Sequence, residues 1–446
     1  MNTPVSSPAL AAKASKGRQM NLWSVTALGI GAMVGAGIFA VLGQTALLAG
    51  NQSFVSFILG GVVAALCGYS YAKLACRYPD AGGISTYFDE AFGAGRTSGT
   101  LSLIYLFTIA ATIALVAKAF GAYAAPLLFG NANRIWVDLF ASTLVIVLAV
   151  LNMSGAGLVG KAEIFLVGIK LIILVGLMAV GAISMTHAHP VSPAHSSLTG
   201  VFSGVGLTFL AYAGFGMMAN AAGSVPAPER TIPRAIYLAI GVVILLYVGL
   251  AIVVLGNVSV TQLAQHSDTA VAEAARPVLG QAGYAVVSVA ALLATASGVN
   301  AWIFSAMKIS ATLAKAGQLP RVFSKLVWRK GTRGLFLIVA IVLIALNSFN
   351  LDALAHIASA IFLVSYLAVQ VAHWRLIKQT RGSRFMVATG FAAMAAVFVY
   401  FLWSTLQAQP WSVAAIAIFV ACSWAIEMFL DPKGGIPTPA QVVHVH

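Results

Sequence analysis

The chain has 446 residues, of which 60% are hydrophobic and only 8% are charged, and its formal net charge is +14. A soluble domain carries about 25% charged residues, so this composition excludes a water-soluble globular protein and indicates a membrane protein. The apolar runs are long and continuous rather than short and alternating, which favours membrane-spanning helices over a β-barrel.

Two long stretches, 19–72 and 171–228, contain no Lys, Arg, Asp or Glu. Each is long enough for two spans of about 20 residues. We therefore predict one membrane domain over 20–430, between short tails at 1–19 and 431–446. The apolar segments predict twelve transmembrane helices, at 20–49, 53–76, 98–126, 134–151, 160–184, 198–223, 234–256, 281–306, 334–350, 353–374, 384–406 and 410–430.

The basic residues predict the orientation. If both termini are cytoplasmic, nearly all of the 25 Lys and Arg residues lie on the inner side; Arg134 and Arg276 lie outside, and Lys118 and Lys170 lie within spans. This bias is typical of a multi-pass protein of the inner cell membrane. Because the cations are scattered over several loops and both tails, we expect contact with membrane lipid and no binding of nucleic acid.

Three connecting segments are predicted to have structure of their own. Residues 80–92 form an amphipathic sequence that favours a short interfacial helix on the inner side. The basic segment 308–330 is expected to begin with a helix that continues the eighth span. The semi-polar segment 260–280 favours helix and is expected to cap the outer vestibule.

The cysteines and loop histidines give no sign of a disulfide or a metal centre. We expect the cysteines to be small core residues because they lie in or at the ends of spans: Cys67, Cys76 and Cys422. We expect the outer-loop histidines to be solvated: His187, His189, His195 and His266.

Spans 1 and 6 each carry a glycine-rich segment, at 29–39 and 209–216. Because glycine weakens a helix by about 1 kcal/mol relative to alanine, a local break near the membrane midplane is expected in both. Close helix packing through Gly31 and Gly35 is the alternative explanation for one segment. Two such segments, each opening a block of five spans, favour inverted repeats at 20–184 and 198–374, with two extra helices at 384–430.

Interrupted helices expose backbone groups that bind charged ligands. The amino end of a half-helix attracts a carboxylate, and the carbonyl end attracts an ammonium group. An amino acid carries both groups, so a pair of broken helices suits it without a buried side-chain charge.

Three motifs resemble those of the amino acid–polyamine–organocation superfamily. They are the glycine-rich segment Gly29–Phe39, the loop Glu229–Ala235 after span 6, and the loop Tyr78–Tyr87 after span 2. Together with their spacing they make the whole chain similar to proton-coupled, ApcT-like amino acid permeases. The resemblance implies a LeuT-like, all-α fold with twelve helices, in which helices 1 and 6 are unwound within a 5 + 5 inverted repeat.

The resemblance also implies the binding residues. The substrate carboxylate is expected at the backbone N–H groups of Ala36, Gly37 and Ile38. The ammonium is expected at the carbonyls of Ala32, Met33, Ala211 and Gly214. The candidate gates are Phe209, Tyr212 and Phe215, whereas several family members carry an aromatic residue at the position of Leu210. Side-chain specificity is expected to depend on small residues such as Thr108, Thr112 and Asn300.

Lys170 lies near the midplane of span 5, where a cation costs at least about 2.5 kcal/mol. In the ApcT-like type a lysine here carries the coupled proton, and we expect it to donate to carbonyls between Gly29 and Ala32 and to Ser297. Burial disfavours the charged form of an amine, so proton release near neutral pH is expected. The alternative is a fixed structural cation. Lys118 is expected to extend to the outer interface.

The sequence therefore predicts a secondary transporter that takes up amino acids by proton symport with alternating access. A neutral substrate is favoured because span 6 carries no carboxylate. The alternative is a sodium-independent exchanger of amino acids or amines, with Lys170 as the fixed cation. We expect a monomer or weak oligomer without cofactor, metal or sodium requirement.

Two other classes fit less well. A membrane enzyme would gather catalytic groups at one face, whereas no nucleophile motif is present and the span interiors are expected to lack carboxylates. A channel would need a continuous polar pore.

Overall fold

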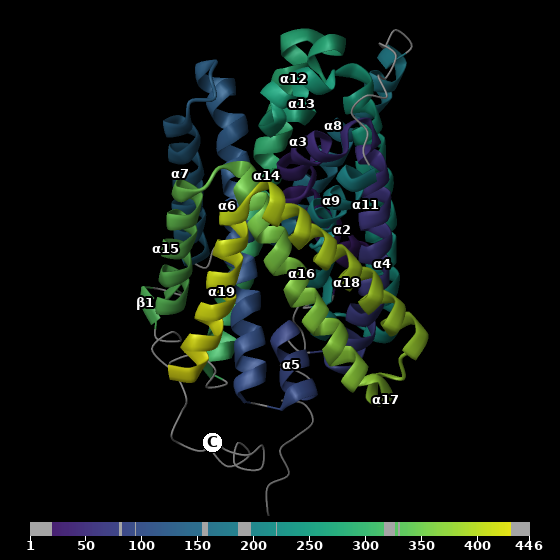
Figure 1. Ribbon diagram of the computed structural model, residues 1–446, viewed down its shortest axis with the longest axis vertical. Helices are drawn as coiled ribbons and strands as arrows, with labels where there is room; N and C mark the ends of the chain where they lie inside the picture. Colours follow the sequence, from purple (N-terminus) through teal and green to yellow (C-terminus); the bar gives the residue numbers. More distant parts are fainter. Residues whose placement is uncertain are drawn as a thin grey trace, which may run out of the picture.

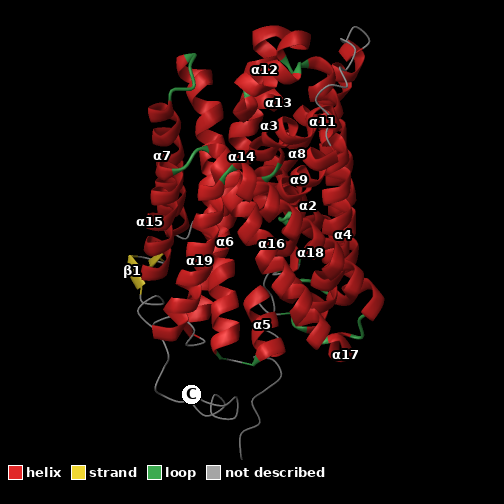
Figure 2. Ribbon diagram, in the orientation of Figure 1, coloured by secondary structure: helices red, strands yellow, loops and turns green. Residues whose placement is uncertain are grey.

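The computed structural model describes residues 20–79, 83–93, 95–153, 159–185, 198–219, 221–315, 326–328 and 331–429. These residues are mostly helical, and most of the helices run along one long axis (Figure 1; Figure 2). Two short strands, β1 (Leu326–Trp328) and β2 (Gly331–Thr332), pair in antiparallel fashion.

The helices, in chain order, are α2 (Leu22–Ala36), α3 (Ile38–Ala49), α4 (Ser53–Arg77), α5 (Ile84–Phe92), α6 (Arg96–Phe129), α7 (Arg134–Met153), α8 (Val159–Ser184), α9 (Leu198–Tyr212), α10 (Phe215–Ala219), α11 (Pro228–Asn257), α12 (Val260–Gln265), α13 (Ala270–Glu273), α14 (Arg276–Lys315), α15 (Arg333–Ser348), α16 (Leu351–Arg375), α17 (Ile377–Thr380), α18 (Arg384–Ala408) and α19 (Pro410–Phe429). Single 3-10 turns are η1 (Gly50–Gln52), η4 (Ala222–Ser224) and η5 (Ser267–Thr269).

Nine helical stretches of the described chain are long and apolar enough to cross a membrane, and three shorter apolar helices lie at 22–35, 333–348 and 410–425. One of the nine stretches, Ile38–Arg77, combines α3 and α4. Each of the twelve predicted ranges lies on helix, although several ends shift. The chain is therefore a multi-pass helical membrane protein, whereas the assignment of its helices to two inverted repeats stays a prediction.

Local sequence explains several helix starts. Asn21 and Asn350 precede α2 and α16, and each accepts a backbone N–H three residues later, from Ser24 and Ala353, at 2.9 Å. Such caps satisfy amide groups that have no partner within the helix. Pro228 opens α11, where its missing N–H costs no helical hydrogen bond.

The helices differ in how much of their surface the protein itself covers. In α6, 83% of the apolar segment is buried, against 22% in α7 and in α18. Large apolar side chains on outer helices are exposed: Ile172 on α8, Phe385 on α18 and Trp411 on α19, at 74%, 76% and 84%. Lipid chains rather than water suit such surfaces. The core of the molecule therefore lies around α6, and α7, α18 and α19 face outwards.

The segment predicted to cap the bundle is helical, as expected from its sequence. It forms α12, η5 and α13, which lie at one end of the molecule, here called the α12 end (Figure 1). Gln44 of α3 donates to Asp268 of η5 at 2.9 Å. A Cβ atom at Gly43 would lie 1.9 Å from the carbonyl oxygen of Ser267, so only glycine allows this close approach. The segment is thus fixed against α3.

The predicted interfacial helix is present as α5, with buried Tyr87 and Phe88, while residues 80–82 lie outside the described chain. It lies at the opposite end from α12, together with α17, and this end is here called the α5 end (Figure 1). The predicted continuation of the eighth span is also present, because α14 extends to Lys315. Residues 316–325 lie outside the described chain.

The three cysteines are free thiols. Cys67 is buried and Cys76 is partly buried, as expected, but the prediction for Cys422 was wrong because its side chain is exposed on α19. Of the four loop histidines, His266 is exposed, and His187, His189 and His195 lie outside the described chain.

The prediction for Lys118 was wrong. Its side chain is only 6% exposed, and it pairs with Asp138 of α7, which is 15% exposed. The ammonium group also donates to the carbonyl oxygen of Leu346 in α15 at 2.8 Å. The expectation that the spans lack carboxylates was wrong for the same reason, because Asp138 lies inside α7. This ion pair joins α6, α7 and α15, and the carboxylate is what allows the ammonium to stay buried.

Replacing Lys118 by methionine is expected to lower the stability by about 3 kcal/mol, because the Asp138 carboxylate then loses its buried partner. The double variant Lys118→Met with Asp138→Leu is expected to regain most of the loss. Thermal unfolding of the purified protein in detergent measures both. Equal losses in the single and double variants would show that the unpaired Asp138 carboxylate is not the cause of the loss.

Candidate functional site

The first helix of the membrane domain is interrupted at Gly37, as predicted. Helix α2 ends at Ala36 and α3 begins at Ile38, while Gly37 has φ −99° and ψ −85°. The carbonyl oxygen of Gly37 accepts from Ala40 and Val41, so it starts the new helix. The amino end of α3 therefore lies inside the protein, next to the carbonyl end of α2.

The second predicted interruption separates α9 from α10. Helix α9 ends at Tyr212 and α10 begins at Phe215, with Ala213 and Gly214 between them. A Cβ atom at Gly214 would lie 2.5 Å from the backbone nitrogen of Met33. Because residue 214 is glycine, the two interruptions are in direct backbone contact.

Tyr247 of α11 connects the two carbonyl ends. Its hydroxyl group lies 2.8 Å from the carbonyl oxygen of Met33 and 3.3 Å from that of Ala211. The Met33 oxygen also accepts the Gly37 N–H at 2.8 Å. Both lone pairs of the Met33 carbonyl are thus in use, and an ammonium group at this atom must displace one donor.

The predicted binding residues that the structure describes are brought together and buried. Ala32, Met33, Gly37 and Ile38 on the first pair of helices are buried, and so are the residues from Phe209 to Ala219 around the second break. Nothing is described for the side chain of Ala36. An amino acid at this point would be enclosed by protein.

The three candidate gates lie in different surroundings. Tyr212 donates to the carbonyl oxygen of Phe57 in α4 at 2.9 Å, and its ring lies 5.2 Å from that of Tyr247. Phe209 and Phe215 instead contact Tyr366 of α16, at ring distances of 5.5 and 5.4 Å.

Phe209 and Phe215 belong to an aromatic layer that also contains Tyr71, Phe362 and Tyr366. The Tyr366 hydroxyl donates to the carbonyl oxygen of Ala213 at 2.9 Å, which ties the layer to the second break. Tyr71 contacts Tyr87 of α5, so the layer lies between the breaks and the α5 end. On the other side, Phe39 of α3 packs against Tyr123 of α6.

Lys170 of α8 is buried, with 1% of its surface exposed, and its ammonium group donates to Ser297 of α14 at 3.0 Å. The contact with carbonyls between Gly29 and Ala32 stays a prediction. Close to this pair, Gly35 of α2 meets Gly298 of α14, since a Cβ atom at Gly298 would lie 2.7 Å from the Gly35 carbonyl carbon. The lysine thus joins α8 to the helix that packs directly on α2.

The residues expected to set specificity are separated. Thr108 of α6 lies 2.8 Å from Ser365 of α16, and both are buried. Thr112 donates to the carbonyl oxygen of Thr108 at 2.8 Å. Asn300 of α14 instead accepts from Asn152 of α7 at 2.7 Å. Thr108 thus contacts α16, the helix that carries Ser365 and the Tyr366 ring of the aromatic layer. Asn300 instead contacts α7, an outer helix.

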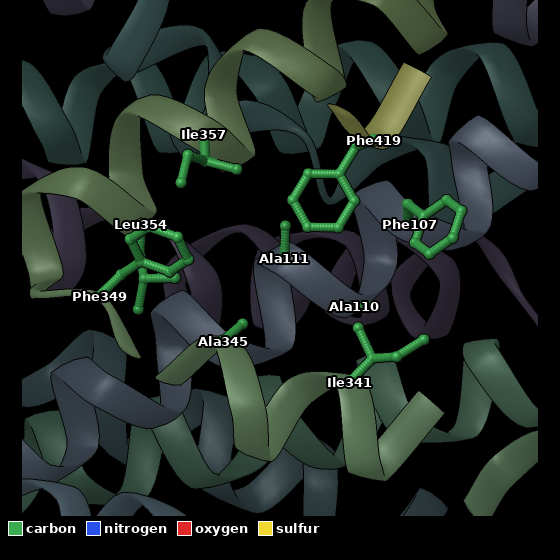
Figure 3. Close-up of a pocket in the computed structure, with 9 residues that line it drawn as sticks. All are labelled: Phe107, Ala110, Ala111, Ile341, Ala345, Phe349, Leu354, Ile357 and Phe419. Carbon is green, nitrogen blue, oxygen red and sulfur yellow. The ribbon is translucent and has the colours of Figure 1, made fainter. Parts of the chain in front are cut away.

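Figure 3 shows a pocket away from the helix breaks, between α6, α15, α16 and α19. Its lining side chains are all apolar: Phe107, Ala110, Ala111, Ile341, Ala345, Phe349, Leu354, Ile357 and Phe419. No group there can bind the charged ends of an amino acid. The helix breaks therefore remain the candidate site.

Sequence reasoning missed Tyr247, Tyr71 and Tyr366. A signal was available, because a tyrosine hydroxyl inside a membrane helix needs an acceptor. What the sequence does not give is which carbonyl each hydroxyl meets.

Comparison with known proteins identifies the family of the chain. Residues 20–435 match the model of a protein family described as "Amino acid permease". The "Inner membrane transport protein YbaT" of Escherichia coli is 44% identical over 406 residues, covering 90% of this chain and 94% of that protein. The "Methylthioribose transporter" of Bacillus subtilis is 25% identical, covering 80% and 81%. The "Branched-chain amino acid permease BcaP" of Lactococcus lactis is 28% identical, covering 49% and 52%.

Proposed function

The chain belongs to the amino acid permease family and is a transporter rather than an enzyme, and on that premise we propose that it takes up neutral amino acids by proton symport. The observation that carries the proposal is the contact between two interrupted helices in the buried interior of the bundle. The proposed fold is LeuT-like, with α2–α3 and α9–α10 as the unwound first and sixth helices.

The two charged ends of the substrate would bind different parts of the breaks. The carboxylate is proposed to meet the N–H groups of Ala36, Gly37 and Ile38 at the amino end of α3, where the helix dipole favours an anion. The Gly37 N–H now donates to the Met33 carbonyl oxygen, so it can bind the carboxylate only after that hydrogen bond breaks. The ammonium is proposed to meet the carbonyls of Ala211 and Gly214, with Ala32 and Met33 beside them.

A neutral side chain fits the described surroundings. Helix α10 reads Phe215-Gly216-Met217-Met218-Ala219, and the aromatic layer below it supplies no carboxylate. A cationic side chain would be buried here without a counter-charge, which is costly. The name of BcaP, a branched-chain amino acid permease, is consistent with an apolar substrate.

Lys170 is the proposed proton carrier. When protonated it donates to Ser297 and fastens α8 to α14, which packs on α2. Loss of the proton would remove the charge from a fully buried site and weaken this connection. The α2–α3 and α9–α10 helices would then be free to move relative to α8 and α14.

The two ends of the bundle would open in turn. We propose that the α12 end faces outwards and the α5 end inwards, with both termini cytoplasmic. The aromatic layer would then be the inner gate, and the contact of α3 with η5 would be part of the outer one.

The proposal is tested by uptake into proteoliposomes of a mixture of radiolabelled neutral amino acids, without sodium and with the outside more acidic. Accumulation above the outside concentration, and its loss when the pH gradient is collapsed, is the expected result. Uptake that ignores the gradient but rises when the vesicles are preloaded with amino acid would contradict symport. It would identify the exchanger, with Lys170 as a fixed cation.

A further inference from the structure

A cluster of basic residues lies where α16, α17 and α18 meet, at the α5 end of the molecule (Figure 1). Lys378 belongs to α17, Arg381 follows that helix, and Arg384 opens α18. All three residues are exposed, and none pairs with a carboxylate in the part of the chain that the structure describes. This cluster, here called the α17 corner, is therefore available to an anion from outside the protein.

Buried contacts fix the backbone of the α17 corner against α4. The ring of His373 is buried and lies 2.8 Å from the Ser70 hydroxyl of α4 and 3.1 Å from the Thr380 hydroxyl of α17. On the other side of the turn, the Ser383 N–H donates to the Tyr69 hydroxyl of α4 at 2.8 Å. The turn that carries the cations is thus attached to α4 on both sides.

Arg381 has an unfavourable backbone conformation. Its φ of 51° and ψ of 40° are left-handed, a region that glycine adopts easily and that a residue with a Cβ atom avoids. The glycine of this turn is instead Gly382, where a Cβ atom would lie 2.8 Å from Nε2 of the buried His373. Close packing explains Gly382, but it does not explain an arginine at 381. Strained residues of this kind cluster at sites that bind ligands.

Membrane topology alone does not account for a fixed cluster. The positive-inside bias places cations on one side of the membrane but sets no geometry for them. Here two exposed aromatic residues flank the turn, Trp374 on α16 and Phe385 on α18. Tryptophan is enriched at the level of the lipid head groups, and an exposed phenylalanine suits the acyl chains next to them. The α17 corner therefore combines cations for a phosphate with apolar surface for a lipid.

We propose that the α17 corner binds the head group of an anionic phospholipid, with Lys378, Arg381 and Arg384 around the phosphate. Basic clusters at a membrane surface attract anionic lipids, and each cation changes the affinity about fivefold. The aromatic residues on either side favour a lipid over a soluble anion. The inference goes beyond the general expectation of lipid contact because it names the site. It is independent of substrate and proton, since it requires only that the chain lies in a membrane.

The first test removes the three charges together. Phosphatidylglycerol is titrated into the purified protein in a neutral detergent, and the melting temperature is recorded. The wild-type protein is expected to be stabilised, because a ligand that binds the folded state raises the melting temperature. In the triple variant Lys378→Gln, Arg381→Gln and Arg384→Gln, the apparent affinity for phosphatidylglycerol is expected to fall about 100-fold.

The matched control removes three exposed basic residues that lie on three separate helices. It carries Arg230→Gln on α11, Lys308→Gln on α14 and Arg333→Gln on α15, and it is expected to respond to the lipid like the wild type. An equal loss of affinity in both triple variants would overturn the site, because net charge alone would then attract the lipid. A wild-type protein stabilised equally by phosphatidylcholine, or equally by inorganic phosphate, would also contradict an anionic lipid site.

A second variant, Arg381→Gly, separates lipid binding from folding. Glycine relieves the left-handed strain, so the melting temperature in neutral detergent is expected to equal or exceed that of the wild type. The affinity for phosphatidylglycerol is nevertheless expected to fall about fivefold, because one cation is lost. An unchanged affinity would show that the strained arginine does not serve the lipid and would overturn its place in the site. Neither test measures transport, so their failure would leave the proposed function untouched.

Discussion

Replacing Lys170 by alanine is expected to reduce pH-driven accumulation of neutral amino acids to the level of protein-free vesicles. The ammonium group is buried and donates to Ser297, so its removal deletes both the proposed proton carrier and the connection between α8 and α14. Uptake of the radiolabelled substrate under an imposed pH gradient measures the loss. Exchange of external label for preloaded substrate shows whether the variant still folds and binds.

Lys170→Arg distinguishes a proton carrier from a fixed cation. Arginine keeps the positive charge but does not release its proton in proteins. We therefore expect this variant to exchange substrate without responding to the gradient. A Lys170→Arg protein that accumulates substrate like the wild type would instead identify residue 170 as a structural cation.

Replacing Gly214 by alanine is expected to abolish transport and to destabilise the protein. The added methyl carbon would lie 2.5 Å from the Met33 nitrogen and 2.7 Å from the Ala32 carbonyl carbon. These are backbone atoms of α2, so the two interruptions must separate, at a cost of about 1–3 kcal/mol typical of overpacking. Uptake and the melting temperature measure the two effects.

Gly241→Ala is the matched control for Gly214→Ala. Gly241 lies within a membrane helix, α11, and a Cβ atom there would meet nothing within 4 Å. This variant is expected to transport normally. If both alanine variants transported like the wild type, the contact between the two breaks would be unnecessary for function.

The membrane-spanning helices could be predicted from the length of the uncharged apolar stretches alone. Stretches without charge have to span the bilayer as helices, because no other open structure satisfies the backbone there. The amphipathic sequence at 80–92 and the helix-favouring sequence at 260–280 located the short helix α5 and the helical cap. The ends of the helices were less predictable. The seventh span, for instance, was predicted to begin at 234, whereas α11 begins at Pro228, because proline fits the first turn of a helix.

The positions of the two breaks were predictable because glycine acts locally. Gly37 and Gly214 both lie where the helices stop and where two backbones meet, and the clustered glycines around each gave the signal.

Contacts between helices were the part that the sequence did not reveal. Lys118 was expected to extend to the outer interface, as long cationic side chains commonly do. Its partner Asp138 was missed because helix rotation decides whether residues on α6 and α7 meet. Tyr247 was overlooked because one tyrosine in an apolar helix resembles any other core residue. Its role depends on Met33 and Ala211, which only the packed structure brings together.

The central claim is that substrate and proton move together, and the most direct measurement is substrate-evoked proton flux. Proteoliposomes in weak buffer, with a pH-sensitive dye inside and no imposed gradient, receive a neutral amino acid from outside. Proton symport predicts that the interior becomes more acidic as substrate enters, and that Lys170→Arg shows no such change. Entry of labelled amino acid without any change of internal pH in the wild-type protein would contradict the claim.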